Sequence, residues 1–573
     1  MKRDAEDNSA QDTKKLKESP AEHVDLAHAL GLSEFLSNDF DPLFGQIKNR
    51  IEDFLVTEVG PDGKDSSLTS FEIPEKPKRN ENVQLVDLSE EIQVGLKELL
   101  SEDSKSYLIP APDDKAERTR LHKTIATFST SLSTETVKEG EAGFIKVTIK
   151  SKKFRGNRDN GFDDDSKFLH FTMLKWNIGT SDAIMRLANV MNINPRNMSY
   201  AGLKDKRGIT SQRVSCKMLE PKRLTGLNKT FFNANPAGAK EVVYEKNFIT
   251  GNFTFAKAPL KLGDVSGNKF CIALRECDTT TADNLAKLRT MLLEKGFINY
   301  FGMQRFGNAG NTNVIGRLIL KKDYKSAIET ILTANDNHKP DVVACLKHFK
   351  ETGNANESFG KLKYKKSIEG NVLSALCKEP TNYKGALKSL HHKQQTLYAH
   401  AYQSYVWNKT VSKRIQKYGT QVLAGDLVSQ DGDVKNVRQI LETELSTASF
   451  CDVVLPLPGF DIKLPENECK IFLEEALQED DMSLEDFGGP LGKEFDVGGA
   501  YRNLIYKPSE FSAEVVQYSE ENEKLVATDL DNVLKISFQP AGVGEKVAIL
   551  CRFTLPKSCY ATMLLREISK GRI

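Results

Sequence analysis

Apolar and polar side chains alternate at several places along this chain, and each place predicts a strand. Residues 51–59 alternate and end at a turn rich in glycine and proline, and residues 168–176 are also strand-like. Near the C-terminus the apolar members of one alternation are Val547, Ile549, Cys551, Phe553 and Leu555. Pro556 ends that strand, and Ser558 is expected to cap a closing helix over residues 560–568.

Apolar positions at helical spacing predict helices between these strands. One face recurs at i, i+3, i+4 and i+7 and consists of Ile184, Leu187, Ala188 and Met191. A second face contains Leu285, Leu288 and Leu292 and stops at Gly296. Farther on the pattern is mainly helical and includes a long helix that ends near Gly419. Two prolines and a glycine within residues 453–460 predict an irregular segment there.

The order of these patterns predicts an α+β protein whose mixed-sheet domain is interrupted by insertions. The sheet domain is expected to comprise residues 40–61, 166–320 and 506–573. A mainly helical insertion would occupy residues 321–505. Residues 62–165 are rich in Glu, Lys and Ser and contain weaker elements, so they predict a second, smaller α+β insertion.

Composition narrows the classes of function. The net charge is only +1, so any nucleic-acid site must be local. The nine cysteines show no metal-ligand spacing, which argues against a zinc site and for a reducing compartment. No apolar run approaches the ~20 residues of a membrane span. No phosphate-binding loop, dinucleotide fingerprint or catalytic triad stands out, which favours chemistry without a cofactor.

The N-terminal residues 1–25 predict a disordered tail. The tail contains Lys2 and Arg3 and then, ten residues later, a second basic cluster at residues 14–17. Two basic clusters at that spacing resemble a bipartite nuclear-import signal, so we expect the protein in the nucleus and also in the cytoplasm. An ordinary charged tail has the same composition, and the two interpretations are compatible.

Asp205 is the leading candidate for chemistry. It lies in a short loop between Gly202 and Gly208, next to Lys204, Lys206 and Arg207. Nearby cations favour the ionised form of an acid, and an ionised carboxylate can act as nucleophile or general base. Residues 195–225 contain eight Lys or Arg, Arg213 among them, against two acids, an excess that suits a phosphate backbone. The alternative is a solvated, charged turn.

A second constellation places an amide beside aromatic rings. Asn299 precedes Tyr300 and Phe301. An unstacked base needs an aromatic face to stack on and a polar group to bond its edge. Ordinary core packing of the aromatic residues is the alternative, and it is the preferred interpretation of Phe306.

Arg118 and His122 form a third feature, within the smaller insertion. Their spacing of four residues places both on one face of a helix. Two unrelated surface residues would give the same pattern.

These residues resemble a known family, the TruD-type pseudouridine synthases. Residues 201–207, around Asp205, are similar to the family's catalytic motif, and further similar motifs follow in the same order along most of the chain. They are Lys48 with residues 52–54, residues 267–270 and 274–276, residues 299–307, residues 457–459, and residues 555–567. The insertion at 62–165 and the basic N-terminus resemble the eukaryotic branch. Within that insertion, Arg118 and His122 resemble the Arg-x3-His type of module that binds single-stranded nucleic acid.

The resemblance implies a role for each matching residue. Asp205 would be the nucleophile of uridine isomerisation. The local excess of positive charge assigns contact with the RNA backbone to Lys204, Lys206, Arg207 and Arg213. Phe54 and Asn299 would contact the target base or its neighbours, and Lys48 and Glu52 would lie near the active site. Tyr560 stands where many bacterial members have Phe, so stacking should survive. Phe301 stands where other pseudouridine synthase families place a catalytic Tyr, and it cannot transfer a proton.

The resemblance also implies substrates and leaves alternatives open. The expected substrates are uridines of tRNA, commonly position 13, of small noncoding RNA and of mRNA, modified by a monomer that needs neither cofactor nor metal and does not bind membranes. One alternative is a catalytically silent RNA-binding or scaffold protein of the same fold. Another is a glycoside hydrolase, which would need a second carboxylate paired with Asp205. Whether Asp205 attacks C1′ or abstracts the 2′ proton stays open, as does the acceptor of the C5 proton.

Overall fold

A computed structural model gives the fold of the chain. It describes residues 26–76, 88–101, 106–129, 131–139, 142–149, 166–236, 238–278, 280–307, 309–430, 433–539 and 542–572. The basic clusters of the N-terminal tail lie outside these residues. Among the described residues, no helix combines the length and the apolar character that a bilayer-spanning segment requires.

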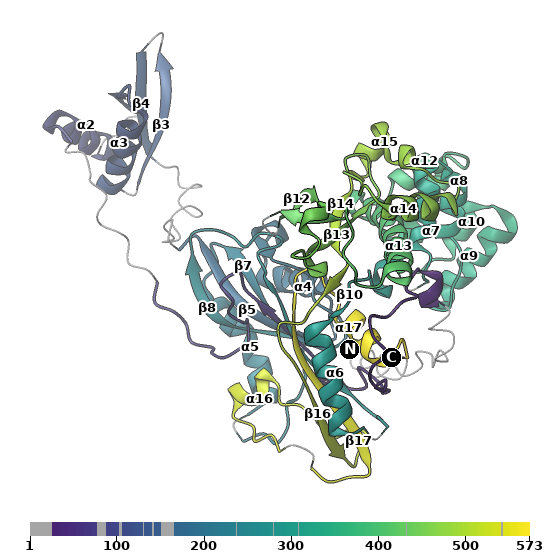
Figure 1. The fold of residues 1–573 in the computed structure, drawn as a ribbon. Coiled ribbons are helices and arrows are strands. Elements are labelled where there is room, and N and C mark those ends of the chain that lie inside the picture. The colour runs from purple at the N-terminus through teal and green to yellow at the C-terminus, as the bar shows by residue number, and fades with distance from the viewer. Residues whose placement is uncertain are drawn as a thin grey trace.

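A mixed eight-stranded sheet is the largest sheet among the described residues (Figure 1). Along the sheet the strands run in the order β16 (Phe511–Tyr518), β17 (Lys546–Pro556), β9 (Gly267–Leu274), β1 (Phe54–Val59), β7 (Ile209–Lys217), β5 (Phe168–Trp176) and β8 (Phe248–Ala256), with β6 (Met198–Tyr200) beside β7. The pair β1–β7 is parallel, whereas the other neighbours pair antiparallel. Three distant parts of the sequence thus share one sheet.

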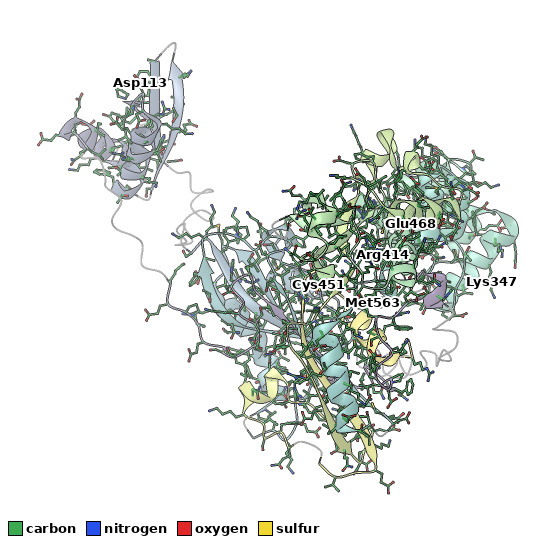
Figure 2. All side chains as sticks on the ribbon, in the orientation of Figure 1. Asp113, Lys347, Arg414, Cys451, Glu468 and Met563 are labelled. Carbon is green, nitrogen blue, oxygen red and sulfur yellow. The ribbon has the colours of Figure 1, made fainter. Side chains whose placement is uncertain are left out.

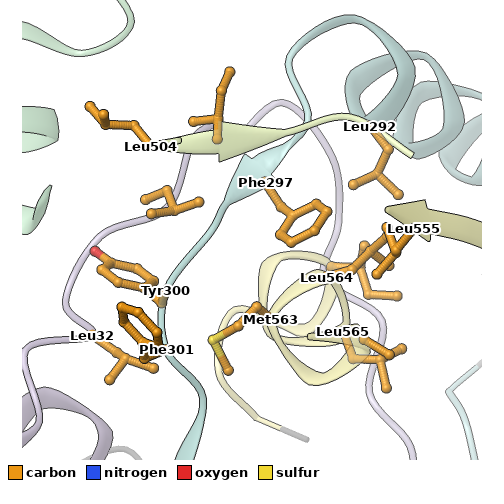
Figure 3. Close-up of a cluster of buried hydrophobic side chains, with 14 of the residues drawn as sticks. Leu32, Leu292, Phe297, Tyr300, Phe301, Leu504, Leu555, Met563, Leu564 and Leu565 are labelled. Atoms are coloured by element: carbon orange, nitrogen blue, oxygen red, sulfur yellow. The ribbon is translucent and has the colours of Figure 1, made fainter. Parts of the chain in front are cut away.

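Helices cover this sheet and bury its apolar side chains. One core joins β5, β7 and β8 to α4 (Thr180–Met191) and α5 (Pro221–Ala234). A larger core joins β1, β9 and β17 to α6 (Ala282–Glu294) and α17 (Ala561–Ser569). The short helix α16 (Asp529–Leu534) belongs to a smaller cluster that includes Trp176. Figure 3 shows part of the larger core, where Phe297, Phe301 and Met563 converge.

The middle of the chain forms a helical unit with its own core. Its helices are α7 (Thr312–Leu320), α8 (Tyr324–Ile331), α9 (Pro340–Thr352), α10 (Ala355–Gly360), α11 (Ile368–Lys378), α12 (Tyr383–Lys388), α13 (His392–Tyr418), α14 (Glu468–Gln478) and α15 (Gly489–Glu494). A four-stranded sheet accompanies them, in the order β12 (Asp433–Gln439), β11 (Leu427–Gln430), β13 (Val453–Leu457) and β14 (Ala500–Asn503). In Figure 2, Arg414 lies among crowded side chains and Lys347 lies at the periphery.

Helix α13 connects the two cores. Its residues Trp407 and Val411 belong to the larger sheet core, whereas Tyr402 and Val406 belong to the helical unit. Three of its polar residues recur every four positions and therefore share one helix face. They bond the segment that follows β10 (Phe297–Ile298): Ser404 to Arg305, Asn408 to Phe301 and Ser412 to Tyr300. The helical unit thus holds one of the sequence motifs in place.

A small α+β unit lies between β1 and β5 in the sequence. It consists of α2 (Glu90–Ser101), β2 (Tyr107–Pro110), α3 (Lys115–Phe128), β3 (Leu132–Glu139) and β4 (Ala142–Ile149), with a core of its own. The strands form an antiparallel sheet in the order β2-β4-β3. Arg118 and His122 both lie on α3, as their spacing predicts.

The predicted fold class, a mixed-sheet α+β domain with a mainly helical insertion, is confirmed, whereas two local predictions are wrong. Residues 453–457 form strand β13. Strand β11 pairs only with Val453 and Val454, so at Pro456 the strand has a neighbour on one side, β14, and none on the other. A proline is tolerated where one side of a strand has no neighbour. The closing helix begins after Tyr560, whereas Ser558 adopts a left-handed backbone (φ 69°) outside it.

Candidate active site

A cavity of about 490 Å³ opens beside Asp205. Five segments far apart in the sequence line it: Phe54 and Val56 of β1, residues 203–206 of the loop, Asn268 and Phe270 of β9, Gln304, and residues 559–562 at the start of α17. Because side chains two apart on a strand share a face, β1 and β9 both present their residues to the cavity. Aromatic and apolar side chains line the cavity together with a comparable number of polar and charged ones, a mixture that suits a base with a phosphate backbone.

The carboxylate of Asp205 is held at one oxygen. Lys48 Nζ lies 3.3 Å from Oδ1, and Gln304 Nε2 donates to the same oxygen at 3.3 Å. Within the part of the chain that the structure describes, Oδ2 accepts no hydrogen bond. One oxygen is therefore anchored and the other stays available for reaction.

Lys48 also covers an aromatic ring of the cavity. Its ammonium lies 3.9 Å from the ring centroid of Phe54, within the range of a cation–π interaction. Lys48 itself adopts a left-handed backbone, φ 60°. The cation therefore links the aromatic wall to Asp205.

A buried lysine supports the loop from behind. Lys175 is completely buried, and its Nζ donates to the main-chain carbonyls of Asp205 at 2.7 Å, Ile178 at 3.0 Å and Lys204 at 3.4 Å. Burial lowers the pKa of Lys175 to about 8, and the charge of Asp205 opposes that shift. Removing this amine would leave several carbonyls without a donor.

The rest of the loop is tied to the sheet by buried polar groups. The amide N–H of Lys204 donates to Thr180 Oγ1 at 3.0 Å, and the Thr180 hydroxyl donates to Gln212 Oε1 at 2.9 Å. Gln212 Nε2 then donates to the carbonyl of Gly202 at 3.1 Å. At the other end, Gly208 has φ 137°, and a Cβ there would lie 2.5 Å from the carbonyl oxygen of Phe54. Only glycine lets the loop approach β1 so closely.

The four basic residues of the predicted RNA contact separate into two groups. The ammonium of Lys204 is buried and lies 2.9 Å from Glu58, which also pairs with Arg213 at 3.3 Å. Glu58 is itself completely buried, so this acid draws both cations inward. Lys206 and Arg207 are exposed, and Lys206 lines the cavity. In this structure, therefore, Lys206 and Arg207 are the exposed members of the four, whereas the side chain of Arg213 is 25% exposed and that of Lys204 is buried.

The amino-acid sequence was compared with known proteins. The model of the family described as "tRNA pseudouridine synthase D (TruD)" matches residues 137–568. Human pseudouridylate synthase 7 homolog is 34% identical over 553 residues, which cover 94% of this chain and 80% of the human protein. The chain belongs to the TruD family of pseudouridine synthases. It is therefore an isomerase that acts on RNA.

Other proteins similar to this TruD-family chain are also described as pseudouridine synthases. The multisubstrate pseudouridine synthase 7 of Schizosaccharomyces pombe is 29% identical, over 94% of this chain and 89% of the yeast protein. Among solved structures, a putative tRNA pseudouridine synthase D from Methanosarcina mazei superimposes with a TM-score of 0.59 at 18% identity. That match covers 95% of this chain and 98% of the other chain, and it shows that the fold is shared.

Three residues of the TruD-family motifs lie behind the cavity wall instead of on it. Asn299 is buried, its Oδ1 accepts from Arg502 at 2.8 Å, and its Nδ2 donates to the carbonyl of Asn503 at 3.1 Å. Phe301 packs edge-on against Trp407 in the core. Glu52 pairs with Arg50 at 3.0 Å. In this structure they support the segments that form the site, and base contact by Asn299 or Phe301 stays a prediction.

Several side chains of the site have no role in the sequence analysis, and three of them bear on the chemistry. Gln304 lies within the motif at residues 299–307, whose resemblance implies no role for it, and Lys175 falls within the strand predicted at residues 168–176. A lysine within the otherwise apolar residues 173–176 is the one signal that could have indicated it. Cys559 also lines the cavity, and burial raises the pKa of its thiol to about 12. A thiol that stays protonated is a poor nucleophile, so Cys559 does not compete with Asp205.

Proposed function

We propose that this chain converts uridine to pseudouridine in tRNA, at position 13, and in small noncoding RNAs and mRNA, with Asp205 as the catalytic residue. The proposal depends chiefly on one observation: Asp205, whose Oδ2 accepts no hydrogen bond from the described residues, lines a cavity formed by segments from five parts of the chain. Family membership supplies the reaction class.

The reaction requires a base to leave its stack and turn within the enzyme. The N1–C1′ bond breaks and a C5–C1′ bond forms, while C5 loses a proton and N1 gains one, so nothing is consumed. Extracting the base costs a few kcal/mol. Phe54 and Tyr560 line the cavity. Tyr560 would supply the replacement stacking surface, and Phe54, whose ring Lys48 covers, would border the base. Asp205 would act either on C1′ or on the 2′ proton, and both routes use the same carboxylate.

Electrostatic attraction would bring the RNA to this site. Lys206 and Arg207 are exposed in the loop that contains Asp205. Contacts between such cations and phosphates position a nucleic acid without reading its sequence. We assign the phosphate contacts of the loop to these two residues. Lys204 and Arg213 would act indirectly, by holding the loop through Glu58.

The small α+β unit would add a second RNA contact. Arg118 and His122 share one face of α3, and both ring nitrogens of His122 bond threonines of β3, at 2.8 and 3.0 Å. We propose that this unit binds single-stranded RNA. Deleting residues 88–149 should weaken mRNA binding more than tRNA binding, and equal losses would contradict this assignment.

We also propose that the protein is a monomer present in the nucleus and the cytoplasm. Nuclear entry would depend on the two basic clusters within residues 1–25. Replacing Lys14, Lys15 and Lys17 by Ala should shift a fluorescent fusion toward the cytoplasm, and unchanged nuclear signal would contradict this import signal. Light scattering at micromolar protein should report one chain.

The test of the proposed activity is direct. The purified protein is mixed with an unmodified tRNA transcript, and pseudouridine is mapped by carbodiimide treatment and primer extension. A new stop that reports position 13 supports the proposal. Binding of the tRNA without any new modified site would support the alternative, a silent RNA-binding protein of the same fold. Hydrolysis of a simple glycoside in the absence of RNA would support the other alternative, a glycoside hydrolase.

A further inference from the structure

Two arginines converge on one buried ring next to the catalytic cavity. The guanidinium carbon of Arg502 lies 4.1 Å from the ring centroid of Phe301, and that of Arg305 lies 5.7 Å from it. Arg502 is 8% exposed and Arg305 is half-buried. Two positive charges therefore lie close to the same buried aromatic ring.

Neither arginine has an acid partner among the described residues. Arg502 donates to the carbonyl and the side-chain oxygen of Asn299, both at 2.8 Å, and Arg305 Nε donates to Ser404 Oγ at 3.1 Å. Within the described ranges, the terminal nitrogens of Arg305 donate no hydrogen bond. Burial lowers the pKa of both guanidinium groups, because desolvation disfavours the charged form.

Two other buried arginines of this chain pair with acids, whereas the buried Arg566 donates to the main-chain carbonyls of Leu32 and Glu34. Arg275 pairs with Asp53 at 2.8 Å, and Arg414 pairs with Asp426 at 3.2 Å. The titratable groups that act on Arg502 are instead Tyr560, Cys559, Tyr506 and Arg305, and Tyr560 also acts on Arg305. Tyrosine and cysteine side chains are ordinarily uncharged at neutral pH. A buried charge without a partner is costly, so this pair is suited to an anion supplied from outside.

The position of the pair indicates which anion. Gln304, the residue before Arg305, donates to Asp205 inside the cavity. On the other side, the guanidinium carbon of Arg502 lies 5.8 Å from the ring centroid of Tyr560, which lines the cavity. The cationic pair therefore lies just behind the surface on which the base would stack.

We infer that Arg305, backed by Arg502, binds a backbone phosphate of the RNA within one nucleotide of the target uridine. This inference rests on the proposed function. Phosphate fits because a guanidinium fork can donate two parallel hydrogen bonds to two of its oxygens. Arg305 makes the contact, because its terminal nitrogens donate no hydrogen bond to the described residues. Arg502 adds positive charge from the interior. The phosphate would hold the backbone while the base is turned into the cavity.

The test uses neutral phosphates in a chemical double-mutant cycle. The protein has Asp205→Asn, so that bound RNA is not turned over, and the tRNA is assembled from two strands. Methylphosphonates replace the phosphates flanking the target uridine, one at a time. With Arg305 present, one replacement should weaken binding about tenfold, the effect of one charged hydrogen bond. With Arg305→Gln added, binding should already be about tenfold weaker, and the same replacement should have no further effect.

Controls separate this inference from the proposed function. Arg289→Gln, an exposed arginine of α6 that donates to the carbonyl of Phe511, should leave the methylphosphonate effect unchanged. Arg305→Lys keeps the charge without the fork and should retain part of the effect, and it replaces Arg305→Gln if the latter fails to fold. Equal methylphosphonate effects with and without Arg305 would overturn the phosphate site even if the wild-type protein makes pseudouridine. A wild-type protein that makes none would instead refute the proposed function.

Discussion

The buried ammonium of Lys175 donates to the main-chain carbonyl of Asp205 at 2.7 Å, directly behind the residue whose carboxylate borders the cavity. The same nitrogen also bonds Ile178 and Lys204, so one charge ties strand β5 to the catalytic loop. The backbone of Asp205 is thus held from the interior, while Lys48 and Gln304 hold its side chain from the cavity. Such support for a reacting group is what a preorganised site needs.

Replacing Lys175 with Met tests this support. Methionine keeps much of the side-chain volume but offers no donor, so buried carbonyls lose a partner at about 1–3 kcal/mol each. We expect the single-turnover rate to fall at least about tenfold, because a loop displaced by a fraction of an ångström misplaces its carboxylate. The Kd for tRNA should change little, since Lys175 is buried. An unchanged rate in a protein that binds normally would contradict the role of Lys175.

Lys175 also predicts a pH dependence. Its pKa is lowered from 10.5 to about 8, so the ammonium is protonated below about pH 8 and loses its charge as the pH rises above that value. A neutral amine has one donor fewer and no charge opposite Asp205. The single-turnover rate of the wild-type protein should therefore decline above about pH 8, whereas the residual rate of Lys175→Met should lack this limb. A wild-type rate that stays flat to about pH 9.5 would contradict the prediction.

Gln304 is predicted to orient the carboxylate. Gln304→Ala removes one hydrogen bond to Oδ1 and should lower the rate by about three- to tenfold. Gln304→Glu places a second carboxylate beside Asp205, and like charges at that distance disfavour having both ionised. It should therefore reduce the rate far more than Gln304→Ala does. Equal rates for the two variants, measured by tritium release from labelled tRNA, would show that Gln304 does not act on Asp205.

Lys204 and Lys206 are neighbours of Asp205 with different predicted roles. Lys204→Gln leaves the buried Glu58 with Arg213 alone, so the protein should lose about 3 kcal/mol of unfolding free energy. Lys206→Gln should stay within about 0.5 kcal/mol of wild type in stability, because Lys206 is exposed. It should instead weaken tRNA binding and reduce the salt slope by about 1. A stable Lys204→Gln protein with weakened tRNA binding, or an unstable Lys206→Gln protein with normal binding, would contradict the placement of the two charges.

Local periodicity explains which elements were predictable. The strand at Phe168–Trp176 and the helix at Thr180–Met191 follow from side chains that repeat within a few residues. Strand β13 was missed because Pro456 normally excludes a strand, and its tolerance depends on which neighbours pair beside it. The start of α17 was missed because serine is a good cap by propensity, whereas the chain there turns at Ser558 with a positive φ.

How much of the site could be predicted from the sequence was limited by contacts between distant parts of the chain. Asp205, Phe54, Tyr560 and Lys206 do line one cavity. The inward turn of Lys204 depends on Glu58, and the orientation of the Asn299 amide depends on Arg502, two hundred residues later. Such partners leave no pattern in the local sequence, so the roles that depend on them require the structure.

The central claim is that the carboxylate of Asp205 performs the isomerisation. Asp205→Asn is nearly isosteric, and the main-chain contact with Lys175 needs no carboxylate. The decisive measurement is tritium release from 5-tritiated uridine in tRNA by this variant, with tRNA binding measured in parallel. We predict binding near the wild-type level and no detectable release. Release at a rate near that of the wild-type protein would contradict the assignment of Asp205.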